Sequence, residues 1–476
     1  MKYEAVIGLE VHAELSTKSK IFCSCSASFG GDINTHVCPV CSGMPGSLPV
    51  LNQKVVEYAV KMGLATNCDI NRVSVSARKN YFYPDLPKAY QISQFDRPLC
   101  GAGRVDFLVN GEKRSVRLTR IHIEEDAGKL VHDALPDESL IDFNRCGVPL
   151  IEIVTEPDIR SSAEAKSFLE YTKTTLSYLD ICDCKMQEGS IRCDVNVSVR
   201  PEGSTEFGTR VEMKNINTFS GAVRAIDYEV NRQIELIMEG GTVEQETRRW
   251  DDIKLQNYTL RTKEDAHDYR YFPDPDLVPI EVSDDWLASI EKSLPELPLA
   301  RLARYIDGYM IPAKDAELLV SNKSRSDFLD ECVAKGADAK TAANWLLGDI
   351  AKLLNDSGKE IDGTKLSPSQ LCRLLSLIDQ GVISGSAGKR VLGVLFEEGG
   401  DAEEITKKLG LIQLSDEDAV RGIIKEVISQ NEKSVSDYKG GKQAAFGFLV
   451  GQCMKASKGK ANPSVVNRLL KEMLEA

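Results

Sequence analysis

Residues 6–15 read VIGLEVHAEL, and apolar and polar side chains alternate along them. Successive side chains of a β-strand point to opposite faces of the sheet. Three apolar residues would therefore share one face: Ile7, Leu9 and Val11. Three polar residues would share the other: Glu10, His12 and Glu14. The stretch predicts a half-buried strand whose polar face carries carboxylates and one imidazole.

The same division recurs in later stretches. In RCDVNVSV the valines 195, 197 and 199 alternate with Asp194, Asn196 and Ser198, and in RVEMKNIN the apolar Val211 and Met213 alternate with Glu212 and Lys214. RIHIEEDAGK and PLIEIVTEPD add more acids, which are Glu124, Glu125, Asp126, Glu152 and Glu156. The polar face of a half-buried sheet usually meets only water. Gathered carboxylates repel one another, however, and are tolerated best around a hard cation such as Mg²⁺, which typically accompanies nucleotide phosphates.

The fold class follows from how such segments are distributed along the chain. Short strand-like segments fill residues 1 to about 290, with helical stretches at 162–179 and 222–241 between them. Helical spacing takes over after the proline-containing SLPELPLARLARY. We therefore predict an α+β chain with a mostly antiparallel sheet, followed by a helical domain and a small helical tail domain. The predicted domains are 1–294, 295–410 and 411–476.

Composition limits the functional classes. The 476 residues carry a net charge of -13, which argues against a protein that coats nucleic acid over its whole surface. Residues 439–471 are an exception, with seven Lys or Arg and no Asp or Glu. They form either a phosphate-binding face or an ordinary solvated helical face. No signal peptide or membrane span is apparent, so we expect a cytoplasmic protein. Thirteen cysteines are then expected as thiols or metal ligands.

Four of these cysteines are spaced like the ligands of a metal site. Cys23 and Cys25 form one close pair, and Cys38 and Cys41 form a second pair after twelve intervening residues. Two such pairs on a loop can place four thiolates at the corners of a tetrahedron, which suits a closed structural zinc site. His36 could replace one thiolate. Four incidental cysteines are the other interpretation.

The segment ARKNYFYPDLPKAYQISQFDRPL, residues 77–99, mixes cations with aromatic rings. Such a mixture can bind phosphate oxygens and stack a ribose, a base or a terminal adenosine, although a structural aromatic corner would have the same composition. The sequence contains no GxxxxGK[ST] loop, no GxGxxG after a strand, no Ser-rich amidase stretch and no Cys-His nucleophile pair. Any ATP site must then be built on the sheet, and we do not expect this chain to hydrolyse glutamine.

Several long stretches carry a family resemblance: IGLEVHAELSTKSKIFCSC, CPVCSGMPGSLPVLN, KNYFYPDLPKAYQISQ, RIHIEEDAGK, DFNRCGVPLIEIVTEPD, MQEGSIRCDVNVS, EMKNINTF and RYFPDPDL. With these, the chain resembles the B subunits of glutamine-dependent glutamyl/aspartyl-tRNA amidotransferases over essentially its whole length. The resemblance implies a carbon–nitrogen ligase made of three different subunits. Its amidase-like A subunit would release ammonia from glutamine, and a small C subunit would wrap the other two.

The resemblance also implies what this chain does in the complex. Residues 1–294 would form a cradle that binds ATP, Mg²⁺ and the acceptor end of Glu-tRNA(Gln) or Asp-tRNA(Asn). The side-chain carboxylate would be phosphorylated there and then amidated by ammonia. The helical and tail domains would contact the body of the tRNA. One other hypothesis remains open, a tRNA-binding or assembly subunit without phosphoryl transfer. A third, a zinc-ribbon regulatory protein, does not explain the acidic strands.

Matching motifs and strand faces assign candidate residues. The Mg²⁺ ligands would be Glu10, His12, Glu125, Asp194 and Glu212, with Glu124 and Glu152 as alternates. The groups for ATP phosphates and developing charge would be Lys79, Ser190, Arg192, Lys214 and Asn215. The pocket for the aminoacyl-adenosine end would be shaped by Tyr81, Tyr83, Lys88 and Tyr90.

Overall fold

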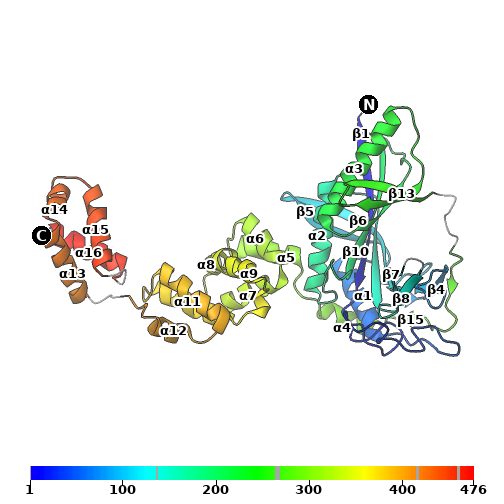
Figure 1. The fold of residues 1–476 in the computed structure, drawn as a ribbon, viewed down its shortest axis with the longest axis horizontal. Helices are drawn as coiled ribbons and strands as arrows, with labels where there is room; N and C mark the ends of the chain where they lie inside the picture. The colour runs from blue at the N-terminus through cyan, green and yellow to red at the C-terminus, as the bar shows by residue number, and fades with distance from the viewer. Residues whose placement is uncertain (1, 136–137, 263–268, 414–416, 458–460, 476) are drawn as a thin grey trace. The chain divides into compact units, whose positions relative to one another are not determined.

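The computed structural model describes residues 2–135, 138–262, 269–413, 417–457 and 461–475. The chain divides into two compact units, Met1–Arg301 and Leu302–Ala476. The first unit combines sheets with helices, and the second is helical (Figure 1). The predicted α+β class is confirmed. The boundary between the two units lies between residues 301 and 302. The sequence analysis places its first domain boundary seven residues earlier, between residues 294 and 295.

The main sheet of the first unit has eight strands in the order β13-β12-β11-β10-β1-β9-β6-β5. All neighbours are antiparallel except β11 and β12, so the sheet is mostly antiparallel, as predicted. Its strands are β1 (Tyr3–Glu14), β5 (Gly103–Val109), β6 (Glu112–Glu125), β9 (Pro149–Thr155), β10 (Ile191–Pro201), β11 (Val211–Ile216), β12 (Glu246–Asp251) and β13 (Gln256–Thr262).

Three smaller sheets complete the strands of this unit. They pair β14 (Phe272–Pro273) with β3 (Ala77–Asn80) and β4 (Tyr90–Ser93), β15 (Ile280–Glu281) with β2 (Val73–Ser74), and β7 (Lys129–Leu135) with β8 (Glu138–Asp142). The helices of the unit are α1 (Gln53–Ala65), α2 (Ser162–Tyr178), α3 (Phe219–Met238), α4 (Asp284–Lys292) and α5 (Pro298–Ala303). Side-chain oxygens of Ser161 and Thr218 cap the N-termini of α2 and α3, as these residue types commonly do.

Strand β1 lies inside the main sheet, hydrogen-bonded to β10 on one side and β9 on the other. Its apolar residues Ile7, Leu9 and Val11 are fully buried in the core, as the alternation predicts. Helices α2 and α3 run along this face of the sheet (Figure 1), and their apolar residues belong to the same core cluster. The opposite face of β1, with its polar residues, is therefore left for chemistry.

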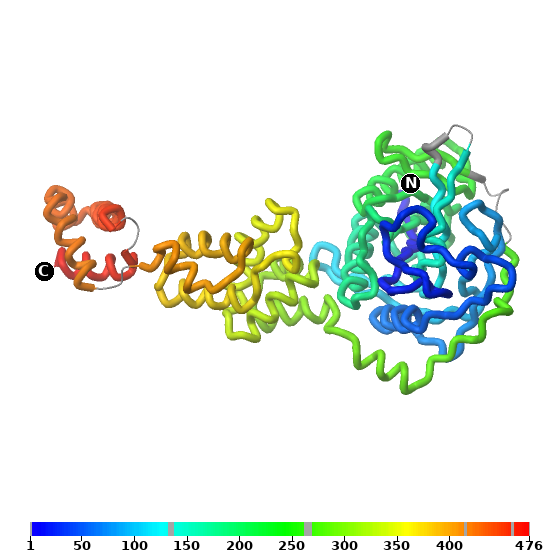
Figure 2. The backbone as a smooth tube through the Cα atoms, turned by 60° about the horizontal axis from the view of Figure 1, so that its bottom comes forward, coloured from blue at the N-terminus to red at the C-terminus, as the bar shows by residue number. Residues whose placement is uncertain are grey.

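In the described residues of the second unit, short helices follow one another along the chain (Figure 2). Its α-helices are α6 (Ala313–Val320), α7 (Lys323–Ala334), α8 (Ala339–Trp345), α9 (Ala351–Ser357), α10 (Pro368–Asp379), α11 (Gly385–Glu398), α12 (Ala402–Lys408), α13 (Glu417–Gln430), α14 (Glu432–Lys439), α15 (Ala444–Ala456) and α16 (Pro463–Glu475). Short π-helical segments occur at Arg304–Gly308 and Leu346–Ile350, and a short 3₁₀-helix occurs at Ile361–Gly363.

Helices α13 to α16 share a small core of their own, formed by residues such as Val420, Ile424, Leu449 and Leu470. This core belongs to the stretch that the sequence assigns to a tail domain. Within the described ranges, none of the helices is both long and apolar enough to cross a membrane.

Candidate functional site

The strand register aligns the predicted polar residues in rows across the sheet. His12 of β1 lies opposite Glu152 of β9 and opposite Arg192 of β10, and Glu152 lies opposite His122 of β6. One step along the same strand face, Glu10 lies opposite Asp194 of β10. Five strands that are distant in sequence thus bring their polar residues to one face, in two groups of potential metal ligands.

The first group joins Glu10, Asp194 and Glu212, whose ligand oxygens lie within 4.8 Å of one another. Asn196 donates a hydrogen bond from Nδ2 to Glu10 Oε1 at 3.0 Å. The ammonium of Lys214 lies 2.7 Å from Asp194 Oδ2 and 2.9 Å from Glu212 Oε1. Burial and the nearby carboxylates of Glu152, Asp194 and Glu212 raise the pKa of Glu10. The group is thus a set of carboxylates whose mutual repulsion a cation relieves.

The second group joins His12, Glu124 and Glu152. Glu152 Oε2 lies 3.6 Å from His12 Nε2 and 3.3 Å from His122 Nε2, and Glu124 Oε1 lies 3.1 Å from His122 Nε2. Burial lowers the pKa of His122, but its bonds to Glu124 and Glu152 outweigh this and raise it to about 9. Although burial opposes ionisation of Glu152, the two histidines hold the pKa of this carboxyl well below its usual range.

His122 is 2% exposed and holds both carboxylates of the second group. The candidate residues predicted from sequence do not include it, although it lies two residues before Glu124 and so on the same strand face. That spacing is the signal that could have found it.

Lys79 of β3 lies beside the second group. Its ammonium lies 5.9 Å from the ring centre of Tyr81 and 5.0 Å from that of Tyr269. Burial lowers the pKa of Lys79, but the nearby carboxylates, Glu124 first among them, raise it overall. Burial raises the pKa of Tyr81 to about 12. The ammonium of Lys79, flanked by the rings of Tyr81 and Tyr269, therefore lies near the carboxylates of the second group.

Glu125 is placed apart from both groups. Its Oε1 accepts hydrogen bonds from the Lys88 ammonium at 2.5 Å and from the Ile92 backbone N–H at 2.8 Å. The Lys88 ammonium also lies 5.3 Å from the ring centre of Tyr90. Lys88, Tyr90 and Glu125 line a separate cavity of about 210 Å³. Tyr83, which the sequence analysis assigns to the pocket for the aminoacyl-adenosine end together with Lys88 and Tyr90, is half exposed.

Three predicted phosphate-binding residues have structural partners. Ser190 Oγ donates to the Lys185 carbonyl, and the Asn215 side-chain amide donates to the Trp250 carbonyl at 3.1 Å. Arg192 lies in the row of His12, and its NH2 donates to Asp126 Oδ2 at 2.7 Å. Asp126 in turn accepts a hydrogen bond from Glu14.

Glu10 of the first carboxylate group lines a cleft of about 300 Å³ that the sequence patterns do not indicate. Its walls include Gly8, Glu10, Ser198, Phe207 and Arg210. Phe207 is 65% exposed at this cleft, and the Arg200 guanidinium lies 5.5 Å from its ring centre. Phe207 and Arg210 belong to the loop between β10 and β11, which shows no alternation, so no sequence pattern identifies them.

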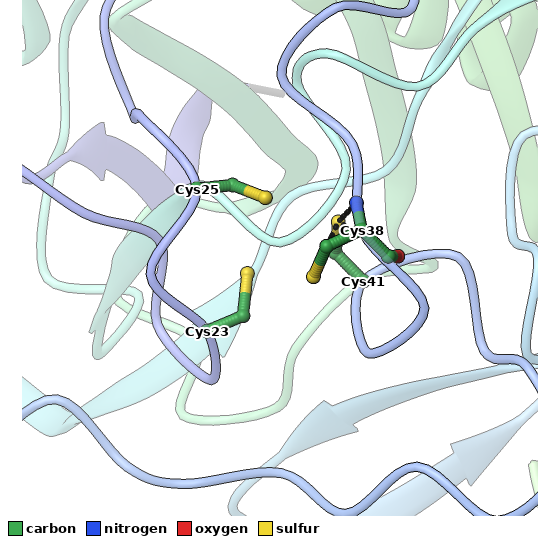
Figure 3. Close-up of side chains that lie close together, drawn as sticks. All are labelled: Cys23, Cys25, Cys38 and Cys41. Carbon is green, nitrogen blue, oxygen red and sulfur yellow. Dashed lines mark hydrogen bonds between the residues drawn. The ribbon is translucent and has the colours of Figure 1, made fainter.

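The four predicted zinc ligands converge (Figure 3). Cys23 and Cys25 face Cys38 and Cys41 from a separate loop, and all four sulfurs lie within 4.8 Å of one another. His36 is not part of this set, and its ring packs against Gly31. All thirteen cysteines are free thiols in the structure.

Comparison with known proteins covers almost the whole chain. Residues 5–288 match the GatB/GatE catalytic domain, and residues 327–474 match the GatB domain. Three curated relatives are B subunits of aspartyl/glutamyl-tRNA(Asn/Gln) amidotransferases. The chain is 58% identical over 478 residues to that of Caldicellulosiruptor bescii, with 100% of both chains covered. It is 57% identical over 474 residues to that of Thermoanaerobacter pseudethanolicus and 52% identical over 476 residues to that of Moorella thermoacetica, again with 100% of both chains covered. The chain therefore belongs to the family of aspartyl/glutamyl-tRNA(Asn/Gln) amidotransferase B subunits.

Proposed function

We propose that this chain activates misacylated tRNA with ATP inside a three-subunit amidotransferase. It would phosphorylate the side-chain carboxylate of Glu-tRNA(Gln), Asp-tRNA(Asn) or both, so that ammonia can convert it to an amide. The observation that carries the proposal is the pair of carboxylate groups on one sheet face, supplied by β1, β6, β9, β10 and β11. Carboxylates gathered in this way suit Mg²⁺ and the phosphates of a nucleotide.

The cleft beside Glu10 is the proposed nucleotide site. Its volume of about 300 Å³ lies at the lower end of the range of small-molecule pockets. The exposed ring of Phe207 offers an aromatic face for the adenine, and Arg210 offers a cation for phosphate oxygens. Gly8 allows close approach, because a side chain there would project into the space between Thr155, Pro157 and Asn196. The phosphates would then extend toward Glu10, Asp194 and Glu212.

The first donor set fits Mg²⁺ well, because it consists of carboxylate oxygens. Glu10, which lines the nucleotide cleft, joins Asp194 and Glu212 in a set of three carboxylates, whereas His12, Glu124 and Glu152 offer two carboxylates and an imidazole. Mg²⁺ bound there would neutralise phosphate charge and align the two reacting anions. Lys79, which lies near Glu124, and Lys214, which lies beside Asp194, would oppose the remaining negative charge during the transfer.

The chemistry requires activation because oxide is a poor leaving group. An oxygen of the substrate carboxylate attacks the γ-phosphorus of ATP, the bond to the β-phosphate oxygen breaks, and ADP leaves. Ammonia then attacks the acyl carbon, the carbon–oxygen bond to phosphate breaks, and the nitrogen loses one proton to a base. The A subunit would supply the ammonia from glutamine, and the C subunit would hold the other two together.

The substrate's acceptor end would lie near the aromatic wall of Lys79, Tyr81 and Tyr269, where bases and ribose can stack. The tRNA body would contact the helical unit, with residues 439–471 as a docking surface. We expect the complex to work in the cytoplasm.

The decisive experiment follows labelled phosphate from ATP in the chain co-expressed with its two partner subunits, with Mg²⁺ present and then chelated. We expect ADP formation that requires both Mg²⁺ and misacylated tRNA. Asp194→Asn should abolish it and leave tRNA affinity unchanged. Asp106→Asn is the matched control, because Asp106 lies on β5, paired with Lys113. Tight tRNA binding without ADP formation would favour a non-catalytic assembly subunit instead.

A further inference from the structure

Four aromatic rings from three segments of the first unit form a continuous row. Tyr81 and Tyr269 meet edge to face with ring centres 5.8 Å apart, and Tyr269 meets Tyr271 in the same way at 6.1 Å. Tyr271 stacks on Phe95, because the two rings are nearly parallel at 8° and their centres lie 4.3 Å apart. The row therefore joins the residue after β3, the segment before β14 and a residue that follows β4.

The two ends of the row have different surroundings. At the inner end, Tyr81 and Tyr269 flank the ammonium of Lys79 beside the second carboxylate group. At the outer end, Phe95 is 49% exposed although Tyr271 covers one face of its ring. The row thus leads from the proposed reaction site to an aromatic surface that a flat partner can reach.

Phe95 is held at a fixed distance from the carboxylates by the two residues that precede it. The Ser93 hydroxyl donates a hydrogen bond to Glu124 Oε1 at 2.7 Å. The buried Gln94 side chain accepts a hydrogen bond from the backbone N–H of Ile123 at 3.0 Å. Both bonds join the Phe95 segment to β6, the strand that carries Glu124, so the exposed ring has a rigid support.

Tyr269 and Tyr271 have an anchor of their own. The backbone N–H of Asn80 donates to the Tyr269 carbonyl at 2.9 Å, and its side-chain amide donates to the Arg270 carbonyl at 2.8 Å. Arg270, between the two tyrosines, has a φ of 43°, a left-handed conformation that costs free energy and persists only where the surroundings hold it. The two rings are therefore arranged before any ligand binds.

The row meets the requirements of an unpaired nucleic-acid strand. Proteins bind such strands with aromatic side chains on which the bases stack and with cations that follow the phosphates. Here Lys79 lies at the inner end of the row, and the exposed Arg270 lies between two of the rings. A duplex does not suit the row, because its bases already stack on one another.

We propose that Phe95 and Tyr271 form the platform on which a base of the unpaired 3′ strand of the tRNA stacks, upstream of the terminal adenosine that carries the amino acid. This inference rests on the proposed function, which places that adenosine beside Lys79, Tyr81 and Tyr269. Phe95 takes no part in the chemistry. It binds the strand and fixes how far the strand enters the cradle.

The test compares tRNA affinities of the chain in complex with its two partner subunits. The probes are uncharged tRNA(Gln) and tRNA(Asn), each intact or without its unpaired 3′ nucleotides. Phe95→Ala should weaken binding of the intact tRNA about tenfold, as loss of one stacked base typically does, and should leave binding of the shortened tRNA unchanged. Equal losses for both tRNAs overturn the proposal and indicate that Phe95 contacts a partner subunit or supports the fold.

Three further variants separate stacking from packing. Phe95→Trp keeps a flat ring and should bind intact tRNA as the unchanged complex does. Phe95→Leu keeps an apolar side chain without a ring and should lose affinity as Phe95→Ala does, and it carries the test if Phe95→Ala does not fold. Tyr258→Ala is the matched control, because Tyr258 is 40% exposed on the edge strand β13, and it should change neither affinity. Full affinity in Phe95→Leu overturns the stacking role.

The proposed function and the platform fail in different ways, because tRNA binding does not require phosphoryl transfer. Phe95→Ala should raise the KM for misacylated tRNA in ADP formation and leave kcat unchanged. If the unchanged complex forms no ADP, the proposed function is contradicted, and the affinities for intact and shortened tRNA still report on stacking. If ADP forms and Phe95→Ala weakens both tRNAs equally, the platform alone is contradicted.

Discussion

The Lys214 ammonium lies 2.7 Å from an oxygen of Asp194, between two of the three carboxylates that we assign to a cation. Without metal, the lysine therefore neutralises the group that metal would occupy. Mg²⁺ bound by these carboxylates would displace the ammonium from this position, and the freed cation would then be available to a phosphate. The lysine would thus compete with the metal before ATP binds and cooperate with it afterwards.

This competition predicts opposite effects of Lys214→Met. Binding of Mn²⁺ without nucleotide should tighten, because the variant has no internal cation to displace, while ADP formation with misacylated tRNA should fall steeply. Electron spin resonance of free Mn²⁺ measures the first effect, and the labelled-ATP assay measures the second. Lys113→Met, which removes a lysine paired with Asp106 on the edge strand β5, is the control and should change neither. Weaker Mn²⁺ binding in Lys214→Met would contradict the competition.

Glu14 predicts a pH dependence of stability. Burial and the neighbouring Asp126 raise its pKa from 4.5 to about 8. Between these values the folded chain keeps a proton that the unfolded chain has lost, so the free energy of unfolding contributed by this group falls as the pH rises. Glu14→Gln has no such proton and should show a smaller decline between pH 5 and 8 in urea unfolding. The exposed Glu112→Gln should keep the original decline, and an unchanged slope in Glu14→Gln would contradict the assignment.

Gly43 predicts a link between the cysteine loop and Lys88. A Cβ at Gly43 would lie 2.6 Å from Lys88 Cγ and 3.3 Å from its Cα, so the residue must be small. Gly43→Ala should displace Lys88 from Glu125 and lower the rate of glutamine-dependent amide formation about tenfold or more, since small misplacements in a site are costly. Gly30 also has a positive φ but nothing within 4 Å. Gly30→Ala should therefore suffer the same backbone strain as Gly43→Ala but leave the rate of amide formation unchanged. Equal rates in both variants would rule out the link.

The tail predicts a salt-dependent affinity for tRNA. Three of the seven cations at 439–471 pair with acids: Lys442 with Asp437, Arg468 with Glu417, and Lys471 with Glu475. At most four then remain for phosphates. Deleting residues 411–476 should weaken tRNA binding and reduce the slope of log affinity against log salt by no more than about 4, because fewer counterions are released. ATP binding should persist. An unchanged slope would exclude a docking role.

Alternation along the strands was enough to predict their faces. Leu9 and Val195 are fully buried, and Glu10 and Asp194 lie opposite each other on the polar face. Here the local period of two residues is imposed by the hydrophobic core, so the sequence shows it directly. The cysteine cluster was likewise predictable, because all four ligands lie within nineteen residues.

The division into two ligand groups was not predictable, because it depends on which strands pair and in which register. Glu124 and Glu125 are neighbours in a strand, so their side chains must point to opposite faces of the sheet. Which of the two joins Glu152 becomes clear only from the pairing of β6 with β9, which brings Glu124 to it. Phe207 and Arg210 lie in an irregular loop whose path no periodicity encodes.

The alternation along β1 also has an evolutionary consequence. Core and reactive residues occupy alternate positions of the same strand, so a substitution at Glu10 or His12 can alter the chemistry and leave the packing of Leu9 and Val11 intact. Insertion or deletion of a single residue between Ile7 and Glu14 is different, because it would exchange the two faces over the rest of the strand. In this lineage, changes in the length of β1 should therefore be much rarer than single replacements.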